Sequence, residues 1–145
     1  MAMNRLIGSA LLALLATLPL AAFAEEKDKD PFDGRLFAPE LIMANRNAIG
    51  LTREQNKQIG ELVVAVQQAV AGRTWEMQSA YFDLMEVLDE PVVDEERAIA
   101  LAKQAVDSET EIKLEQMRLL IRLRNLLTPE QVAVLQAKRA EMSGG

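Results

Sequence analysis

The 145-residue sequence contains neither cysteine nor histidine. Without cysteine, the chain can form no disulfide, offers no thiolate to a metal or a substrate, and has no residue for a lipoprotein anchor. Without histidine, it lacks the commonest general base and the commonest protein ligand of zinc, nickel and copper. The two absences remove the usual means of building a catalytic or metal site.

The remaining reactive groups form no recognisable catalytic arrangement. No serine has a histidine to activate it, and Tyr81 is the only tyrosine. Glu109, Glu111 and Glu115 stand around Lys113 in a pattern typical of a solvated helix surface. We therefore expect a binding protein rather than an enzyme, with no cofactor and no metal site.

Residues 1–24 form a predicted secretory signal peptide. A short region with one positive charge, at Arg5, precedes an apolar run over residues 6–20, and an Ala-Phe-Ala cleavage site ends at Ala24. The proline in the run and the acidic stretch after the cleavage site argue against a membrane anchor. We therefore predict export to the periplasm, and no stable membrane insertion after the signal peptide is removed.

Charge limits the possible partners. The chain has 22 acidic and 16 basic residues, a net charge of −6 at pH 7, and an acidic protein is repelled by nucleic acid. We therefore expect a soluble domain with no nucleic-acid partner. Residues 25–38 are rich in charge and contain Pro31 and Gly34, which predicts a flexible leader ahead of that domain.

One five-residue motif occurs twice, 76 residues apart. It reads Leu-Thr-Arg-Glu-Gln at residues 51–55 and Leu-Thr-Pro-Glu-Gln at residues 127–131. In each copy a threonine stands at a helix N-cap position. A glutamine three residues later completes a capping box, in which each side chain bonds the backbone N–H of the other residue. The predicted structural residues at these two helix starts are Leu51, Thr52, Gln55, Leu127, Thr128 and Gln131.

Two long helices are predicted between the motifs. From Thr52 to about Leu88, apolar residues recur at spacings of four and three, as in a helix that packs along its length against another helix. Pro91 ends this helix, and Asp94 is expected to cap the second one. The expected inward-facing residues at the start of the second helix are Ile99, Ala102 and Val106.

Shorter helices are predicted on either side, at residues 40–47 and 129–142. In the last helix Val132, Ala133 and Leu135 are expected to face inward, and residues 143–145 to form a disordered end. The predicted fold is all-α: a four-helix domain over residues 39–142, built on a long antiparallel helical hairpin with short first and last helices. The hairpin brings the two motifs to the same end of the domain.

A second apolar stripe lies on the first long helix, away from the expected contact between the long helices. Its members are Val64, Ala71, Trp75, Phe82 and Met85. A helix in a two-helix hairpin needs only one apolar face, so another element must cover this stripe or it must serve as a binding surface. Three explanations stay open: cover by a short helix, cover by a second subunit, or a surface for another protein.

Two groups of basic residues are also candidates for function. Arg73 stands among the apolar residues of the first long helix, where it could reach a carboxylate of the partner helix and fix the helix register. Arg118, Arg122 and Arg124 form a basic end on an acidic chain. They either complement the helix dipole or attract an acidic partner.

The signal peptide, the hairpin and the paired Leu-Thr-x-x-Gln motifs resemble the Spy/CpxP family of periplasmic stress proteins, which is related to CnrX/ZraP-type heavy-metal sensors. The resemblance covers most of residues 38–142 and rests on residues 51–55 and 127–131 within this architecture. It implies a four-helix hairpin that pairs into a cradle-shaped homodimer. The metal-sensing branch uses histidines, which this chain lacks, so the resemblance favours the chaperone branch.

The resemblance implies a periplasmic, ATP-independent holdase or envelope-stress modulator that binds unfolded or misfolded proteins. The alternative is a metal-sensing, metal-resistance or regulatory adaptor protein that restrains an inner-membrane sensor kinase or an anti-sigma partner. In either case the expected client or partner surface comprises Val64, Trp75, Phe82, Met85, Arg118, Arg122 and Arg124.

Overall fold

The computed structural model describes residues 31–144. The predicted signal peptide and the first part of the predicted leader lie outside the described residues. The described residues from Phe32 onward form one compact unit. It contains α2 (Pro39–Ala44), α3 (Arg53–Leu88), α4 (Glu95–Leu126) and α5 (Pro129–Ser143), and the described residues include no strand. The prediction of an all-α fold is confirmed.

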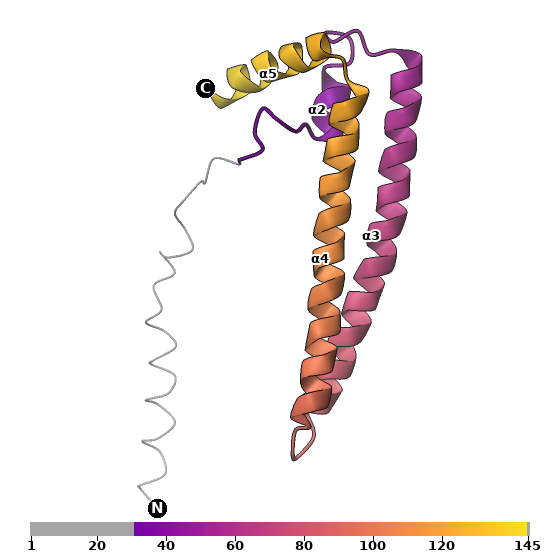
Figure 1. The fold of residues 1–145 in the computed structure, drawn as a ribbon, viewed down its shortest axis with the longest axis vertical. Coiled ribbons are helices and arrows are strands. Elements are labelled where there is room, and N and C mark those ends of the chain that lie inside the picture. The colour runs from indigo at the N-terminus through magenta and orange to yellow at the C-terminus, as the bar shows by residue number, and fades with distance from the viewer. Residues whose placement is uncertain (1–30, 145) are drawn as a thin grey trace, which may run out of the picture. The chain divides into compact units, whose positions relative to one another are not determined.

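The two long helices, α3 and α4, form a hairpin (Figure 1). They pack against each other and are joined by residues 89–94, where Pro91 prevents the helix from continuing. Thr52 Oγ1 accepts the Gln55 N–H at 3.1 Å, and Asp94 Oδ1 accepts the Arg97 N–H at 3.1 Å. Each long helix therefore begins at the side-chain cap that the sequence predicts.

The contact between α3 and α4 changes character along the hairpin. The buried residues of α3 are Ile59, Val66, Ala80 and Val87, which follow the predicted spacing. The buried residues of α4 are Ala98, Ala105, Ser108 and Leu123. The contact therefore uses small side chains on α4 near the 89–94 loop and a large one at its other end.

The predicted inward-facing start of α4 is wrong for Ile99 and Val106, whereas Ala102 is half-buried. Ile99 and Val106 are exposed, and Ala98 and Ala105 are buried in their place. A shift of one residue turns a helix position by about 100°, so the contact runs through the alanines. Small side chains allow two helices to approach closely, which leaves the larger Ile99 and Val106 outside the contact.

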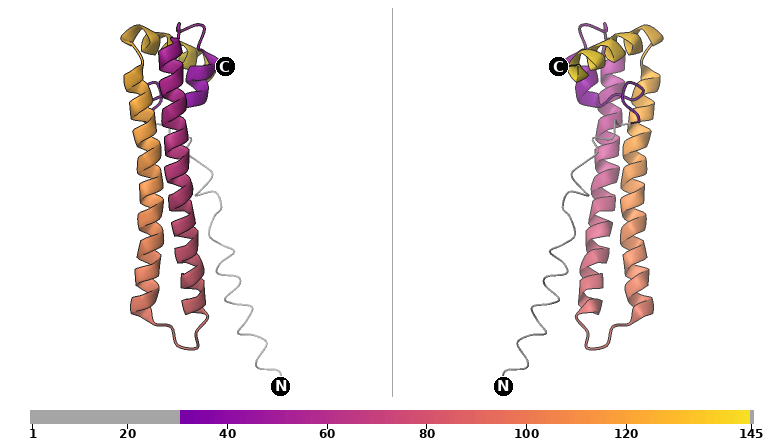
Figure 2. Two further views of the ribbon diagram at one scale, coloured as in Figure 1. Left: turned by 90° about the vertical axis from the view of Figure 1, so that its right-hand side faces the viewer. Right: turned by 90° about the vertical axis from the view of Figure 1, so that its left-hand side faces the viewer.

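The short helices α2 and α5 lie at the end of the hairpin away from the 89–94 loop (Figures 1 and 2). There they close a hydrophobic core with α3 and α4. The buried members of this core are Phe37, Ile42, Ile49, Ile59, Leu123, Leu127, Val132 and Leu135. We call residues 32–73 and 110–144 the capped half, and residues 74–109 the tip half.

α2 is shorter than predicted and ends at Ala44 instead of continuing to residue 47. Asn45 follows it, and its side-chain Nδ2 donates to the carbonyl of Leu41 at 2.8 Å. The chain then turns through Gly50, whose φ of 62° lies in the left-handed region that glycine adopts without strain. This turn leads directly to the first motif.

Residues 32–38 differ from the predicted flexible leader. Phe37 is only 1% exposed and belongs to the capped core. Asp33 accepts a hydrogen bond from Arg139 Nε at 2.7 Å, and the carbonyl of Gly34 accepts one from Gln136 at 2.8 Å. This segment joins the fold because a small core gains much from one buried aromatic ring.

α5 includes Ser143, the first residue of the predicted disordered end. Val132 and Leu135 are buried as predicted. Ala133 is exposed, contrary to the prediction, and the half-buried Val134 packs against the core instead. Position 133 points outward because the inward face of this helix is set by Val132 and Leu135, three residues apart.

Candidate functional site

The two motifs meet in the capped half through their glutamines. The Gln55 amide nitrogen donates to Gln131 Oε1 at 2.8 Å, and the Gln131 amide nitrogen donates to Gln55 Oε1 at 3.0 Å. Each Oε1 also accepts the backbone N–H of its own capping threonine, at 3.1 Å from Thr52 and 2.9 Å from Thr128. We call this arrangement the glutamine pair.

The second N–H of each glutamine amide is bonded as well. Gln55 donates to the carbonyl of Leu126 at 2.8 Å, and Gln131 donates to the carbonyl of Ile49 at 3.2 Å. A primary amide has two N–H donors and one acceptor oxygen, so both side chains are satisfied. The pair ties α3, α4, α5 and the turn before α3 together, and its role is structural.

The predicted apolar stripe on α3 is exposed in the structure. Trp75 is 75% exposed and Phe82 is 67% exposed, and more than half of Val64 and of Met85 is also accessible. Removing each of these side chains from water would lower the free energy by about 25 cal/mol per Å² of apolar area buried. The stripe is therefore a candidate binding surface.

The short helices do not cover this stripe, because they pack on the other side of the hairpin. Leu62 of α3 and Leu119 of α4 pack against the capped core. Val64 and Ile121 follow them by two residues, about 200° around each helix, and both are exposed. Cover by a short helix is therefore excluded within the part of the chain that the structure describes.

α4 adds exposed apolar residues beside Met85 in the tip half. Ile99 directly follows the buried Ala98, and Met85 directly follows the half-buried Leu84 of α3. In two antiparallel helices, the residues that follow a contact residue by one position on each helix lie on the same side of the hairpin. Met85 and Ile99 therefore lie on one side. We define the tip patch by five exposed residues: Trp75 and Phe82, which point away from the helix contact on α3, and Met85, Ile99 and Val106, which lie beside that contact.

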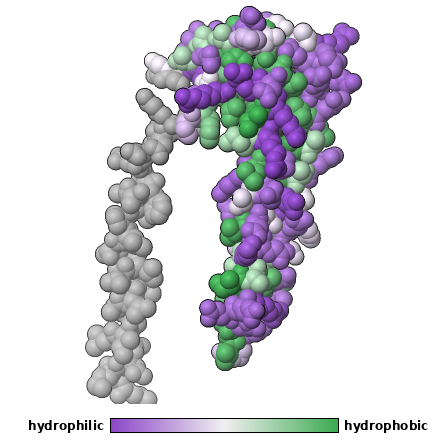
Figure 3. Space-filling view, in the orientation of Figure 1, coloured by the Kyte–Doolittle hydropathy of each residue, from purple (hydrophilic) through white to green (hydrophobic). Residues whose placement is uncertain are grey.

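Hollows accompany the exposed stripe. One of about 310 Å³ is lined by Trp75, Gln78, Ser79 and Phe82. Another, of about 640 Å³, lies along α3 in the capped half, with Val64 in its lining. Apolar surface is visible near the loop end of the hairpin (Figure 3). The first hollow offers an apolar floor with a polar amide and hydroxyl beside it, which suits a polypeptide segment.

Net charge differs between the two halves. The tip half carries ten acidic and two basic residues, net −8, whereas the capped half carries eight acidic and eleven basic residues, net +3. Both basic residues of the tip half are already paired, Arg97 with Glu90 and Lys103 with Asp107. Six carboxylates of the tip half have no basic side chain within 4.0 Å among the described residues: Asp83, Glu86, Asp89, Asp94, Glu95 and Glu96.

The predicted arginine group lies in the capped half, apart from the tip patch. Arg118 pairs with Glu115 of its own helix. Arg124 Nε donates to the carbonyl of Arg35 at 3.2 Å, which ties segment 32–38 to α4. Arg122 is exposed. The structure therefore does not bring these arginines together with Trp75 into one surface.

Arg73 does not bridge the two long helices directly. Its guanidinium lies 2.8 Å from Glu76 of the same helix. The hydrogen bond to Glu76 and the charge of that carboxylate raise the pKa of Arg73, and Glu111 and Glu115 of α4 raise it to a smaller extent. The predicted direct pairing with a carboxylate of the partner helix is wrong, although those two carboxylates act on Arg73 at longer range.

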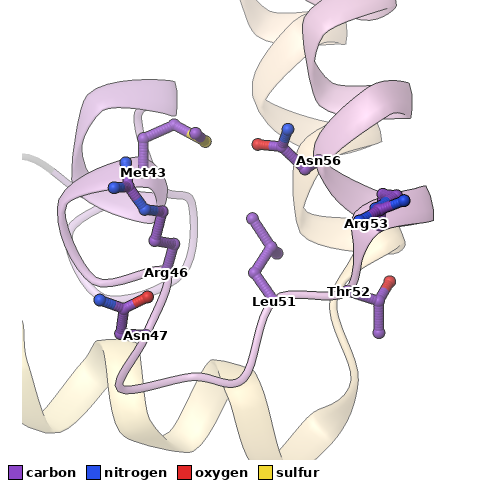
Figure 4. A pocket seen from close by; sticks show the side chains of 7 residues that line it. All are labelled: Met43, Arg46, Asn47, Leu51, Thr52, Arg53 and Asn56. Carbon is purple, nitrogen blue, oxygen red and sulfur yellow. The ribbon is translucent and has the colours of Figure 1, made fainter.

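A polar hollow of about 390 Å³ lies between the α2 turn and the first turn of α3 (Figure 4). Its lining residues are Met43, Arg46, Asn47, Leu51, Thr52, Arg53 and Asn56. Neither Arg46 nor Arg53 lies within 4.0 Å of a carboxylate in the described chain. The sequence carries no signal for this hollow, because two separate elements form it. None of its side chains is buried, so it offers weak attraction for anions and no enclosed site.

Within residues 31–144, no group of three or more acidic, histidine or cysteine side chains is placed to hold a metal ion. The described helices include none that is long and apolar enough to cross a membrane. Comparison with known protein families, with curated proteins and with solved structures finds no match. The candidate site is therefore defined by the geometry of this chain: an exposed tip patch on a hairpin that the capped half holds together.

Proposed function

We propose that this protein is a periplasmic, ATP-independent holdase that binds unfolded or misfolded polypeptide chains on its tip patch. The observation that carries the proposal is the exposure of Trp75 and Phe82 on a hairpin whose other half is well packed. Large contiguous apolar patches on a protein surface mark interaction sites. An unfolded chain supplies apolar side chains that can cover such a patch.

The scaffold suits this task. A holdase that uses no ATP must present its binding surface without unfolding. Here the capped core and the glutamine pair stabilise the fold, and no residue of the tip patch belongs to either. Exposed side chains can therefore contact a client without loss of core contacts. The predicted signal peptide and the resemblance to the Spy/CpxP family support the periplasmic location and a role in the stress response.

A homodimer is part of the proposal. Contact centred on the tip halves would bring together two regions of net charge −8, whereas contact centred on the capped halves would bring together two regions of net charge +3. Repulsion between like charges is weaker in the second arrangement. Val64 and Ile121, both exposed in the capped half, supply apolar area for it. Such a dimer leaves both tip patches free for clients.

Light scattering of an aggregating client tests the proposed activity. At an equimolar ratio, the protein should suppress aggregation. The double variant Trp75→Ala/Phe82→Ala should lose most of this suppression, because it removes the two aromatic rings of the tip patch. Met142→Ala removes an exposed apolar side chain from α5 and should keep full suppression. If the unaltered protein suppresses nothing, the holdase proposal fails and the regulatory adaptor becomes the better explanation.

A further inference from the structure

We infer that the tip patch selects cationic amphipathic segments, in which apolar side chains on one face are flanked by lysine or arginine. The inference rests on the proposed function and names the class of client segment that the patch prefers. It comes from the carboxylates around the patch rather than from the apolar residues themselves.

Carboxylates border the tip patch on both helices. Residues three or four apart on a helix are neighbours on its surface. Glu86 follows Phe82 by four residues on α3, and Glu96 precedes Ile99 by three residues on α4. Two further carboxylates bear the same relation to the patch, one after Met85 and one before Ile99. We call these four residues the acid rim: Glu86, Asp89, Glu95 and Glu96.

The acid rim has no cationic partner in the described chain. Arg97 and Lys103, the two basic residues of the tip half, lie at 3.2 and 2.5 Å from Glu90 and Asp107 respectively. A segment that brings its own lysines or arginines would supply the missing opposite charges. Complementary charge raises the rate and the specificity of association, and like charge disfavours acidic segments. The attraction acts over about 10 Å at roughly 0.1 M salt.

The length of the patch also fits a short segment. Trp75 and Met85 are ten residues apart on α3, which corresponds to about 15 Å along the helix axis. This length matches about three turns of an amphipathic helix, a common form in which peptides lie in an apolar groove. The hollow between Trp75 and Phe82 can receive one side chain of such a segment.

A second copy of this chain is a poor occupant of the tip patch. If one patch faced another, the two acid rims would face each other, and each tip half has a net charge of −8. Like charges placed opposite each other without cations oppose association. A foreign segment with flanking basic residues meets no such repulsion.

Trp75 provides a direct probe, because it is the only tryptophan of the chain and lies in the patch. Three tryptophan-free peptides are titrated into the purified protein at low salt. They share the same apolar residues and carry lysine, serine or glutamate at the flanking positions. The lysine peptide should shift Trp75 emission to shorter wavelength and bind about tenfold more tightly than the glutamate peptide. This difference should shrink at high salt.

Charge variants locate the selectivity. The rim variant combines Glu86→Gln, Asp89→Asn, Glu95→Gln and Glu96→Gln. It should bind the serine peptide as before, and its preference for lysine over glutamate should fall to about twofold or less. The control variant makes the same change of net charge in the capped half, with Glu40→Gln, Glu61→Gln, Glu130→Gln and Glu141→Gln. It should keep the preference, and circular dichroism checks that both variants are folded.

Four other outcomes would overturn either the inference or the holdase proposal, and they can be told apart. Equal affinity for the three peptides would refute charge selection and leave the holdase proposal intact. Peptide binding without any change in Trp75 emission would place the client site elsewhere. A shift of Trp75 emission with protein concentration alone, together with a dimer in sedimentation, would show that a second copy occupies the patch. Selective peptide binding without suppression of client aggregation would refute the holdase proposal alone.

Discussion

The tip half and the capped half of this hairpin use their large apolar side chains in opposite ways. The capped half buries Phe37 and Leu135 almost completely, whereas the tip half exposes Trp75 and Phe82. In the tip half, α4 contacts α3 mainly through alanines. One half therefore supplies most of the stability of the fold, and the other half offers surface for binding.

Polar groups follow the same division. In the capped half, the glutamine pair bonds every donor and acceptor of two amides. In the tip half, the acid rim gathers carboxylates without a basic partner among the described residues. Satisfied hydrogen bonds stabilise a fold, whereas uncompensated like charges weaken it. Binding elements are commonly the less stable parts of a protein.

The largest expected effect is the loss of Phe37 from the capped core. Phe37→Ala removes a ring that is 1% exposed and should lower the free energy of unfolding by about 3–5 kcal/mol. Phe82→Ala makes the same change where the ring is 67% exposed and should cost less than about 0.5 kcal/mol. Urea unfolding followed by circular dichroism measures both.

Comparable losses in the two variants would contradict the division between the two halves, because they would mean that Phe82 is covered in solution. If Phe37→Ala fails to fold, Phe37→Leu provides a milder test in the same position. It should cost about 1–1.5 kcal/mol. A neutral effect of Phe37→Leu and a stable Phe37→Ala protein would together contradict the burial of this ring.

A smaller effect is expected when the glutamine pair is removed. Gln131→Ala or Gln55→Ala removes the two hydrogen bonds between the amides and half of a capping box. Each should lower the free energy of unfolding by about 2 kcal/mol. The double variant should lose about 1 kcal/mol less than the sum of the single variants, because both disrupt the same pair.

Gln67→Ala is the matched control for these variants. Gln67 is exposed on α3, and its replacement should change the free energy of unfolding by less than about 0.5 kcal/mol. Strictly additive losses for Gln55→Ala and Gln131→Ala would show that the two amides do not interact, and the structural role of the paired motifs would then be limited to two independent helix caps.

Local signals account for most of the fold that the sequence predicts. The first capping box, the Asp94 cap and Pro91 place the ends of the long helices correctly, and the second capping box places the start of α5, because each acts on neighbouring backbone groups. The glutamine pair was not predicted, since it depends on how two distant motifs meet in space. The sequence does not mark Phe37 as a core residue, because one aromatic residue in a charged segment shows no periodicity.

The candidate site could be predicted only in part. The outward stripe with Trp75 and Phe82 follows from helical spacing and is exposed in the single chain, as both a second subunit and another protein as its cover would require. The sequence predicts Ile99 in the helix contact because isoleucine is usually buried. The seven-residue interval between Ala98 and Ala105 marks the true contact, but alanine alone is a weak signal for a core position. The acid rim could not be predicted from the sequence, because its members are defined by their positions next to the tip patch.

Hydrogen exchange with and without an unfolded client tests the assignment of stability and binding to separate halves most directly. In the free protein, amides of residues 98–108 should exchange through openings of lower free energy than amides of residues 119–126. With the client, protection should rise at residues 75–86 and 98–108 and stay unchanged in the capped half. Equal protection of the two halves in the free protein, or client-induced protection confined to the capped half, would contradict this assignment.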